Sequence, residues 1–233
     1  AEKMRVDFVA NASHELLTPL AAIKGFIETL DDPAAGDDAA TRSRFLGIMA
    51  TETNRMQALV RDLMSLSRIE AEKYDPPQTP VDFASIIMET VDHLRNSQKD
   101  RGADIAVDVT SDLPPVMGDV GQLRQLASNI LNNAMKYGHA GTPVSVSLTP
   151  SKSGAMINFA VTDVGDGIAP EHLPRLTERF YRVDSGRSRL VGGTGLGLSL
   201  VKHIVDRHRG HLEIRSILGK GTTVSILLPV AHS

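Results

Sequence analysis

A histidine, a carboxylate and a hydroxyl lie within one helical turn at residues 13–19, which read SHELLTP. A neutral imidazole can act as a nucleophile, and a neighbouring carboxylate can fix its tautomer and accept its second proton. Of the eight histidines, we single out His14, where Glu15, the hydroxyl of Thr18 and Pro19 lie within about one helical turn. Pro19 lacks an N–H donor and its ring crowds the Glu15 carbonyl, so we expect a helix that kinks beside His14. These seven residues alone leave open a surface helix whose histidine has only a structural role.

A second set of polar side chains follows a helical pattern at residues 129–137, which read NILNNAMKY. Asn129 and Asn133 are four residues apart and therefore share one helix face, with Lys136 nearby. Amide oxygens suit a hard cation such as Mg²⁺, and a lysine suits a phosphate. The segment is a candidate site for a metal and a phosphate, and a polar helix face that carries asparagine by chance is the alternative.

An aspartate with two glycines follows the strand pattern of Ile157, Phe159 and Val161, at residues 163–167, which read DVGDG. The glycines let the backbone turn sharply beside a ligand, and the carboxylate of Asp163 can accept a hydrogen bond from an exocyclic amine. An ordinary turn at a strand end is the alternative.

Two arginines flank aromatic rings at residues 179–182, which read RFYR. Such a pair can clamp a polyphosphate, and the polar, glycine-punctuated stretch at residues 183–190 can fold over it as a lid. A solvated loop is the plainer interpretation of the same residues.

Glycines gather at residues 192–198, which read GGTGLGL, just before a helical pattern through Val201, Ile204 and Val205. Glycine-rich backbone at a helix N-terminus can present N–H groups to phosphate. The segment is not a Walker A loop because it lacks Gly-Lys-Ser/Thr, and its GxGxG spacing differs from the dinucleotide fingerprint GxGxxG. His203, His208 and His211 follow, but five residues turn a helix through about 140°, so the first two do not share a face and a metal site is not favoured.

Composition excludes several classes of function. With no cysteine, the chain has no disulfide, thiolate metal site or cysteine nucleophile. A net charge of −3, with six Phe, three Tyr and no Trp, gives no reason to expect a nucleic-acid partner. No apolar run approaches the roughly 20 residues that cross a bilayer. The first residue is Ala1 rather than Met, and we expect the chain to be a fragment whose upstream part is missing.

Two heptad seams predict the helices that position His14. Apolar residues recur at spacings of three, four and seven, at Leu16, Leu20, Ile23, Ile27 and Leu30 and then at Phe45, Met49, Met56, Leu59, Leu63 and Leu66, with Glu52 as the one polar intruder. Residues 31–38 between them hold four acids, a proline and a glycine, and are predicted to be a solvated loop. An antiparallel hairpin cannot bury a whole seam by itself, so we expect a homodimer that forms a four-helix bundle.

A proline-rich stretch at residues 74–80, which read YDPPQTP, predicts a linker between two folded parts. We therefore predict a helical hairpin at residues 1–73 and a second domain at residues 81–233. In that second domain, helical patterns alternate with period-two strands, and this predicts a two-layer α/β domain. The helices are expected at 82–99, at 121–137 and from about 197, and the strands at 105–109, 144–148, 157–161, 212–214 and 224–228.

In this order, the segments closely resemble the transmitter region of bacterial two-component sensor histidine kinases, over nearly the whole chain. The resemblance rests on an H box at 8–20 (FVANASHELLTPL), an N box at 129–137, glycine boxes at 163–167, 192–202 (GGTGLGLSLVK) and 219–222 (GKGT), and an F box at 178–184 (ERFYRVD). The phrase HLPRLTERFYRVD is most similar to the phosphate-regulon sensor branch of alphaproteobacteria.

The resemblance implies a dimeric helical bundle, a Bergerat-type ATP-binding domain and an ATP-dependent autokinase. His14 would take the γ-phosphoryl group of ATP and pass it to an aspartate of a response regulator receiver domain. Glu15 would orient His14 and handle its proton, and Thr18 would position water for dephosphorylating the regulator. The chain would be the cytoplasmic portion of an inner-membrane sensor protein, attached to the membrane only through the missing N-terminal region.

The same resemblance assigns roles in the ATP-binding domain. Asn133 would bind Mg²⁺, Asp163 would bind the adenine amine, and Lys136 and Arg182 would bind the phosphates. It also places at the nucleotide Asn129, Tyr137, Gly165, Gly167, Phe180, Tyr181, Gly193, Thr194, Gly195, Leu196, Gly197, Leu198 and Thr222.

Two residues depart from the family pattern. Leu17 stands where the family usually has arginine, so bundle geometry, regulator docking or phosphatase activity is expected to differ. Thr177 stands where many members have the first phenylalanine of the F box, which affects how the lid packs. The main alternative function is a pseudokinase or dimeric scaffold that binds a regulator without catalysis. An ATPase of the gyrase and chaperone type would share the nucleotide pocket but has no use for the His14 helix.

Overall fold

The computed structural model describes residues 2–72, 74–98, 100–183 and 193–231. The chain divides into two compact units, Ala1–Met64 and Ser65–Ser233. Within the described residues, no helix is long and apolar enough to cross a membrane.

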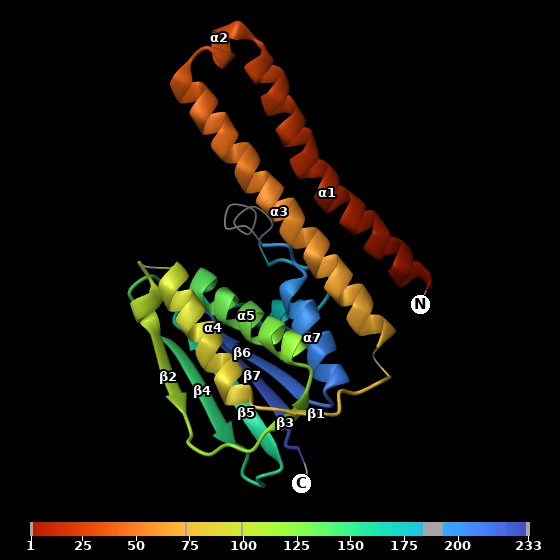
Figure 1. Cartoon of the computed structure of the whole chain (residues 1–233), viewed down its shortest axis with the longest axis vertical. Helices are drawn as coiled ribbons and strands as arrows, with labels where there is room; N and C mark the ends of the chain where they lie inside the picture. The colour runs from red at the N-terminus through yellow and green to blue at the C-terminus, as the bar shows by residue number, and fades with distance from the viewer. Residues whose placement is uncertain (1, 73, 99, 184–192, 232–233) are drawn as a thin grey trace. The chain divides into compact units, whose positions relative to one another are not determined.

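The first unit is an antiparallel helical hairpin, as the heptad seams predict. Helix α1 spans Glu2–Asp31 and lies beside α3, which spans Ala39–Ala71 (Figure 1). The rings of Phe26 and Phe45 meet across the hairpin with centroids 4.9 Å apart. Helix α1 continues through Pro19, so the proline removes one rung of the hydrogen-bond ladder without ending the helix.

The prediction of an irregular loop over residues 31–38 is wrong in part. Residues Pro33–Gly36 form a one-turn helix, α2, between α1 and α3. Its N-cap is Asp32, whose carboxylate accepts a hydrogen bond from the N–H of Ala34 at 2.9 Å. An Asp-Pro pair suits a helix start because the aspartate caps an N–H group and the proline needs none. One of the four acidic residues, Asp32, therefore has a structural role as the N-cap of α2.

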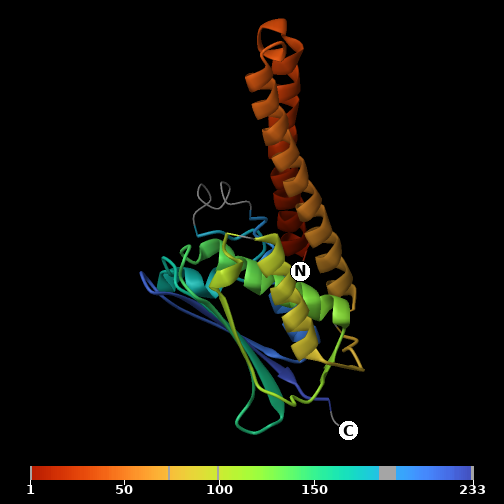
Figure 2. The same ribbon diagram turned by 60° about the vertical axis from the view of Figure 1, so that its left-hand side comes forward.

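The second unit is a two-layer sandwich, which confirms the predicted α/β fold. Its sheet has five strands in the order β2-β4-β5-β7-β6, with β2 and β4 parallel and the other neighbours antiparallel. The strands are β2 (Ile105–Val109), β4 (Val144–Pro150), β5 (Met156–Asp163), β6 (His211–Ile217) and β7 (Gly221–Pro229). Helices α4 (Phe83–Ser97), α5 (Val120–Tyr137) and α7 (Gly197–Arg207) cover one face of the sheet (Figures 1 and 2).

The core lies between these three helices and the sheet. Alternate strand residues point inward, as a strand with one solvated face requires. Phe83 of α4 meets Phe159 of β5 edge to face, with ring centroids 5.5 Å apart. Other fully buried members are Ile87, Leu123, Leu131, Val146, Leu148, Leu200, Val201 and Ile226.

Some short elements are absent from the sequence prediction. Strands β1 (Thr79–Val81) and β3 (Val116–Gly118) pair antiparallel, and the 3-10 helices η1 (Gly102–Asp104) and η2 (Pro170–Arg175) lie in connections. Three residues are too few to display a period of two, so pattern analysis has nothing to detect there.

Arg101 fixes the C-terminal end of α5, where the predicted N box ends. Its guanidinium donates to the carbonyl groups of Met135 and His139 and pairs with Asp104 at 3.2 Å. The last carbonyl groups of a helix have no partner within the helix, so a largely covered arginine there satisfies acceptors and opposes the negative end of the helix dipole.

We therefore expect Arg101→Ala to lower the free energy of unfolding by about 2 kcal/mol, because it leaves charge-assisted hydrogen bonds unmade. The matched control is Arg124→Ala, whose pair with Glu89 is solvent-exposed on α4 and α5 and should contribute well under about 1 kcal/mol. Chemical denaturation of both variants measures the difference. Equal losses would contradict the capping role of Arg101.

Candidate active site

His14 lies exposed on α1. The hydroxyl of Thr18 donates to the His14 carbonyl at 3.0 Å, one turn along the helix. This bond turns the Thr18 hydroxyl back toward the preceding turn of α1, which contains His14. Pro19, the next residue, lacks the N–H that would continue the backbone hydrogen bonds of the helix.

Glu15 is tied to the opposite helix of the hairpin. Its carboxylate lies 3.2 Å from the guanidinium of Arg55 on α3, and both side chains are largely covered, with 25% and 14% exposed. Arg55 also reaches Glu52 at 3.7 Å. A covered charge pair holds a carboxylate in one orientation, so Arg55 fixes the residue beside His14.

Arg55 is a residue that sequence reasoning missed. It is 40 positions from Glu15 in the chain, and only antiparallel pairing of α1 with α3 brings the two together. The available signal was Glu52, the polar intruder of the second seam, which lies one turn from Arg55 and shares its charge network.

Asp163 ends β5 and is 8% exposed. Burial raises the pKa of this carboxyl from 3.8 to about 6, although the backbone N–H of Thr222 and the nearby His139 both act to lower the pKa. A carboxylate that the fold desolvates is typical of a ligand-binding group, because a ligand can supply the hydrogen bonds that water no longer gives.

The DVGDG turn packs against the end of α5. Gly165 forms a β-bridge with Gly138, and a Cβ atom on Gly165 would lie 2.4 Å from the carbonyl oxygen of Tyr137. Gly167 has φ +67°, and a Cβ atom there would lie 2.1 Å from the carbonyl oxygen of Ile217. The turn can therefore approach its neighbours only because these positions lack side chains.

His139 and Asp166 form a second contact that the sequence did not suggest. The Nε2 atom of His139 lies 2.9 Å from the Asp166 carboxylate, and the backbone N–H of His139 donates to the carbonyl of Val164 at 2.8 Å. Together with the glycine bridge, these bonds hold the turn beside Asp163 to the segment that follows α5.

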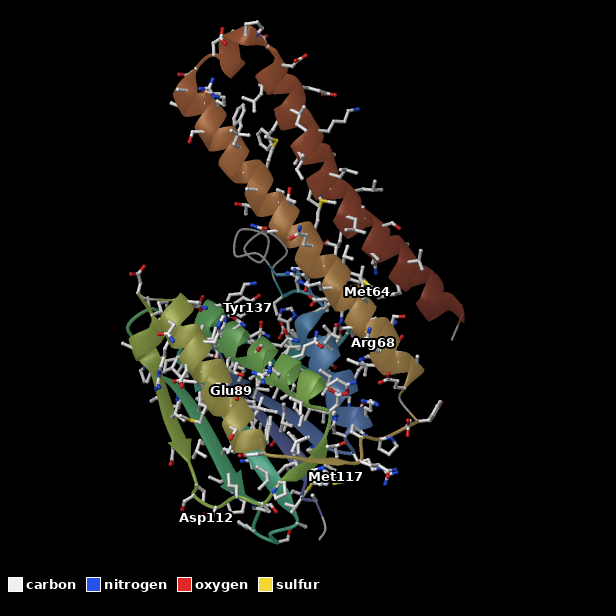
Figure 3. The ribbon with its side chains drawn as sticks, in the orientation of Figure 1. Met64, Arg68, Glu89, Asp112, Met117 and Tyr137 are labelled. Carbon is white, nitrogen blue, oxygen red and sulfur yellow. The ribbon has the colours of Figure 1, made fainter. Side chains whose placement is uncertain are left out.

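The N-box side chains lie on α5 as predicted. Asn129 donates its amide N–H to the carbonyl of Gly197 at 3.5 Å, which links α5 to the first residue of α7. The ammonium of Lys136 lies 4.9 Å from the centroid of the Tyr137 ring at the end of α5 (Figure 3). Asn133, which lies between Asn129 and Lys136 in the sequence, is half-buried.

The donor set of α5 fits a magnesium ion that is held mainly by nucleotide phosphates. Among the described residues, no group of three or more His, Cys, Asp or Glu side chains could hold a metal by itself. Mg²⁺ commonly binds few protein ligands and takes the rest of its oxygens from phosphate and water. A single amide oxygen, that of Asn133, suits this arrangement.

The F-box segment contacts the glycine loop through its backbone. Phe180 has φ +64°, which is unusual for a bulky residue, and its N–H donates to the carbonyl of Gly195 at 2.8 Å. Gly195 has φ +74°, and a Cβ atom there would lie 2.9 Å from the Cα atom of Phe180. The phenylalanine and the glycine therefore determine each other's conformation.

Tyr181 is held from η2. Its hydroxyl lies 2.6 Å from Nδ1 of His172, and the guanidinium of Arg175 stacks 4.2 Å from its ring centroid. Arg182 beside it is half-buried. Of the predicted lid at 183–190, only Val183 lies within the described residues.

The glycine-rich segment leads into α7 as predicted. The N–H of Leu196 donates to the hydroxyl of Thr194 at 3.2 Å, and α7 begins at Gly197 without a side-chain cap. Leu196 is fully buried. Gly193, Gly197 and Leu198 are half-buried.

The structure thus gathers the predicted nucleotide residues in two groups. Asp163, Gly165 and Gly167 lie with Tyr137 and with Thr222, which pairs with Asp163 across β5 and β7. Phe180 joins Gly195, and Asn129 joins Gly197.

Comparison with known proteins agrees with this arrangement. Residues 4–72 match the family described as His Kinase A (phospho-acceptor) domain, and residues 118–232 match that of histidine kinase-, DNA gyrase B- and HSP90-like ATPases. The phosphate regulon sensor protein PhoR of Pseudomonas aeruginosa is 42% identical over 226 residues, which cover 95% of this chain and 49% of that protein.

Two solved structures are also similar. The mycobacterial sensor histidine kinase MprB matches with a TM-score of 0.55 and 30% identity, over 67% of this chain and 99% of that one. Full-length ShkA in complex with AMPPNP matches with a TM-score of 0.68 and 27% identity, over 97% of this chain and 46% of that one. The chain belongs to the sensor histidine kinase family. It spans about half the length of the curated relatives it matches.

We expect Asp163→Asn to stabilise the protein without ligand and to weaken ATP binding. The pKa of Asp163 is raised to about 6 on folding from its usual 3.8, so ionisation costs the folded state stability as the pH rises from about 4 to 6, and that cost persists at pH 7. Asparagine removes it, with a gain on the order of 2 kcal/mol at pH 7 that disappears near pH 4.

Denaturation at both pH values and ATP titration by calorimetry measure the two effects. A variant that is less stable than the wild type at pH 7, or that binds ATP equally well, would contradict this account of Asp163.

We expect Gly167→Ala to be far more damaging than Gly154→Ala, although the two glycines share a similar φ of +67° and +71°. Open space surrounds Gly154, so alanine there meets only the backbone cost of about 1 kcal/mol. At Gly167 the methyl group also collides with the Ile217 backbone, which should add roughly 1–3 kcal/mol. Thermal unfolding measures both, and equal shifts would contradict the close approach of the turn to β6.

Proposed function

We propose that the chain is the transmitter part of a sensor histidine kinase, which autophosphorylates on His14 with ATP and passes the phosphoryl group to an aspartate of a response regulator. The observation that carries the proposal is the joint occurrence in one chain of an exposed histidine beside a fixed carboxylate and a desolvated aspartate in a glycine-lined turn. An ATPase of the gyrase type accounts for only the second feature.

The chemistry assigned to His14 follows from its neutral form. The lone pair of its unprotonated ring nitrogen forms a bond to the γ-phosphorus, and the bond from that phosphorus to the bridging oxygen of ADP breaks with its electrons remaining on ADP. The other ring nitrogen carries its proton during the attack, and the Glu15 carboxylate, held by Arg55 at 3.2 Å, orients the ring and then accepts that proton from the cationic product.

The proposed nucleotide-binding roles are those that the family resemblance implies. Asp163 accepts a hydrogen bond from the adenine amine, which gives the buried carboxylate a polar partner. Lys136 and Arg182 neutralise phosphate charge. Asn133 would hold Mg²⁺ together with phosphate oxygens, and the ion would supply positive charge at the phosphates. Backbone N–H groups from Gly193 to Leu198 border the nucleotide, as an uncapped helix start permits.

We further propose that the hairpin forms a homodimer. Large apolar side chains stay exposed along a single hairpin, namely Val9, Leu20, Ile27, Leu46, Val60 and Met64. A second copy covers such seams by completing a four-helix bundle. We propose residues 1–73 as this dimerisation and phosphoacceptor domain, 74–80 as a linker whose last two residues already belong to β1, and 81–233 as the ATP-binding domain.

The receiver domain of a response regulator is the proposed partner, because an aspartate must accept the phosphoryl group. Thr18 is exposed near His14 and is proposed to position the water that dephosphorylates the regulator. Leu17, which is 61% exposed where relatives usually carry arginine, then faces any docking partner as an apolar rather than a cationic side chain.

The finer assignment is to the phosphate-regulon sensor branch of alphaproteobacteria, in the cytoplasmic part of an inner-membrane protein. The phrase HLPRLTERFYRVD is the basis for the alphaproteobacterial branch, and 42% identity to a phosphate regulon sensor protein of Pseudomonas aeruginosa supports the phosphate-regulon part alone. A pseudokinase has no feature in its favour, since His14, Asn133 and Asp163 are all present.

The test is incubation of the purified chain with γ-labelled ATP and Mg²⁺. We expect label that is acid-labile and base-stable, as phosphohistidine is, in the wild type and in His93→Ala, which changes an exposed histidine of α4. His14→Ala should lose the label and still bind ATP. Label retained in His14→Ala would refute the assignment, and ATP binding without label in the wild type would favour the scaffold alternative.

A further inference from the structure

The last turn of α3 carries an acidic side chain that reaches two other elements of the same compact unit. The carboxylate of Glu70 pairs with the guanidinium of Arg179, next to Phe180, and lies 3.2 Å from Nε2 of His203 on α7. All three side chains are at least partly covered, with 35%, 19% and 28% exposed. We call Glu70, Arg179 and His203 the Glu70 triad.

The position of Glu70 is unfavourable for α3 alone. A carboxylate in the last turn of a helix faces the negative end of the helix dipole. Burial also lowers the pKa of the Arg179 guanidinium, so that side chain is partly desolvated. The attraction between Glu70 and Arg179, together with the contact to His203, offsets these costs and attaches the end of α3 to residues on either side of the glycine loop.

Arg179 precedes a residue that needs outside support. Phe180 holds a left-handed φ of +64°, which a bulky side chain adopts only when its surroundings over-determine it. Support comes from the hydrogen bond to Gly195 and from the contacts of Tyr181 with His172 and Arg175. The Arg179–Glu70 pair supplies the support on the preceding side.

His203 is the residue of α7 that contacts the Glu70 carboxylate. Its Nδ1 atom contacts the carbonyl of Ser199 at 2.7 Å, one turn nearer the helix start that follows the glycine loop. The glycine loop therefore lies between two segments that Glu70 fixes, one through Arg179 and one through His203.

We infer that Glu70 is a positioning residue of the nucleotide site, which holds the Phe180 segment and α7 in the arrangement that binds ATP. The inference rests on the proposed function, because it assigns ATP to this site. Glu70 does not touch the nucleotide and acts through Arg179 and His203. Its loss should therefore weaken ATP binding without removing any group that binds ATP directly.

A neighbouring pair supplies the matched control. Glu72 pairs with Arg207 of α7 at 3.0 Å, so it lies near Glu70 in the chain but reaches α7 one turn further from the glycine loop. Because Arg207 is 8% exposed, Glu72→Gln should lower thermal stability. It should leave nucleotide affinity unchanged, since Arg207 stands at the end of α7 remote from the helix start.

The experiment measures the Kd of a fluorescent ATP analogue, the KM for ATP and the kcat of autophosphorylation in the full chain. We expect Glu70→Gln to raise Kd and KM by about fivefold, with kcat within about twofold of the wild type, which is the size of a partly exposed charge pair. Glu72→Gln should keep both Kd and KM. The charge exchange Glu70→Arg with Arg179→Glu should recover most of the lost affinity.

An unchanged Kd in Glu70→Gln would overturn the inference, as would an equal rise in Glu72→Gln, since the effect would then be general loosening of α3. Should Glu70→Gln fail to fold by circular dichroism, Arg179→Gln tests the same contact from the other side, with the same expected rise. Failure of the proposed function is distinguishable, because the wild type itself would then bind no ATP or carry no label on His14.

Discussion

The structure of the ATP-binding unit depends on the close approach of one turn to the end of one helix. Gly165 bridges Gly138, and the turn leaves no room for a Cβ atom at Gly165 or Gly167. This approach covers Asp163, the last residue of β5, and removes most of its contact with water. The carboxylate that the proposed function uses for adenine is therefore a product of backbone packing, and the pKa raised to about 6 is its energetic consequence.

The remaining contacts of the site act on the backbone rather than on a ligand. Arg101 caps α5, and His139 contacts the Asp166 carboxylate in the turn. The backbone N–H of Phe180 donates to the carbonyl of Gly195. In each case a side chain or N–H group satisfies an acceptor at the end of an element. Phosphoryl transfer needs chiefly positioning and charge neutralisation, so a site made of fixed segment ends is suited to it.

In the hairpin, too, a contact between two elements fixes the orientation of a candidate site residue. Glu15 is oriented by Arg55 from the opposite helix, whereas His14 is exposed, as the nucleophile role proposed for it requires. The apolar side chains left uncovered along α1 and α3 mark the faces on which the proposed dimer forms. In the proposed function, the hairpin supplies the histidine that is phosphorylated and the second unit supplies the ATP site.

Local pattern determined the elements and the motifs. Heptads, period-two strands and glycine clusters predicted the hairpin, the two-layer sandwich and the order of the motifs, because periodicity and turn chemistry are properties of neighbouring residues. It could not reveal α2 as a capped turn, the three-residue strands β1 and β3, or the partners Arg55, His139 and Glu70. Those pairs join residues 27 to 133 positions apart, and only the packing of helices against helices and sheet decides which distant charges meet.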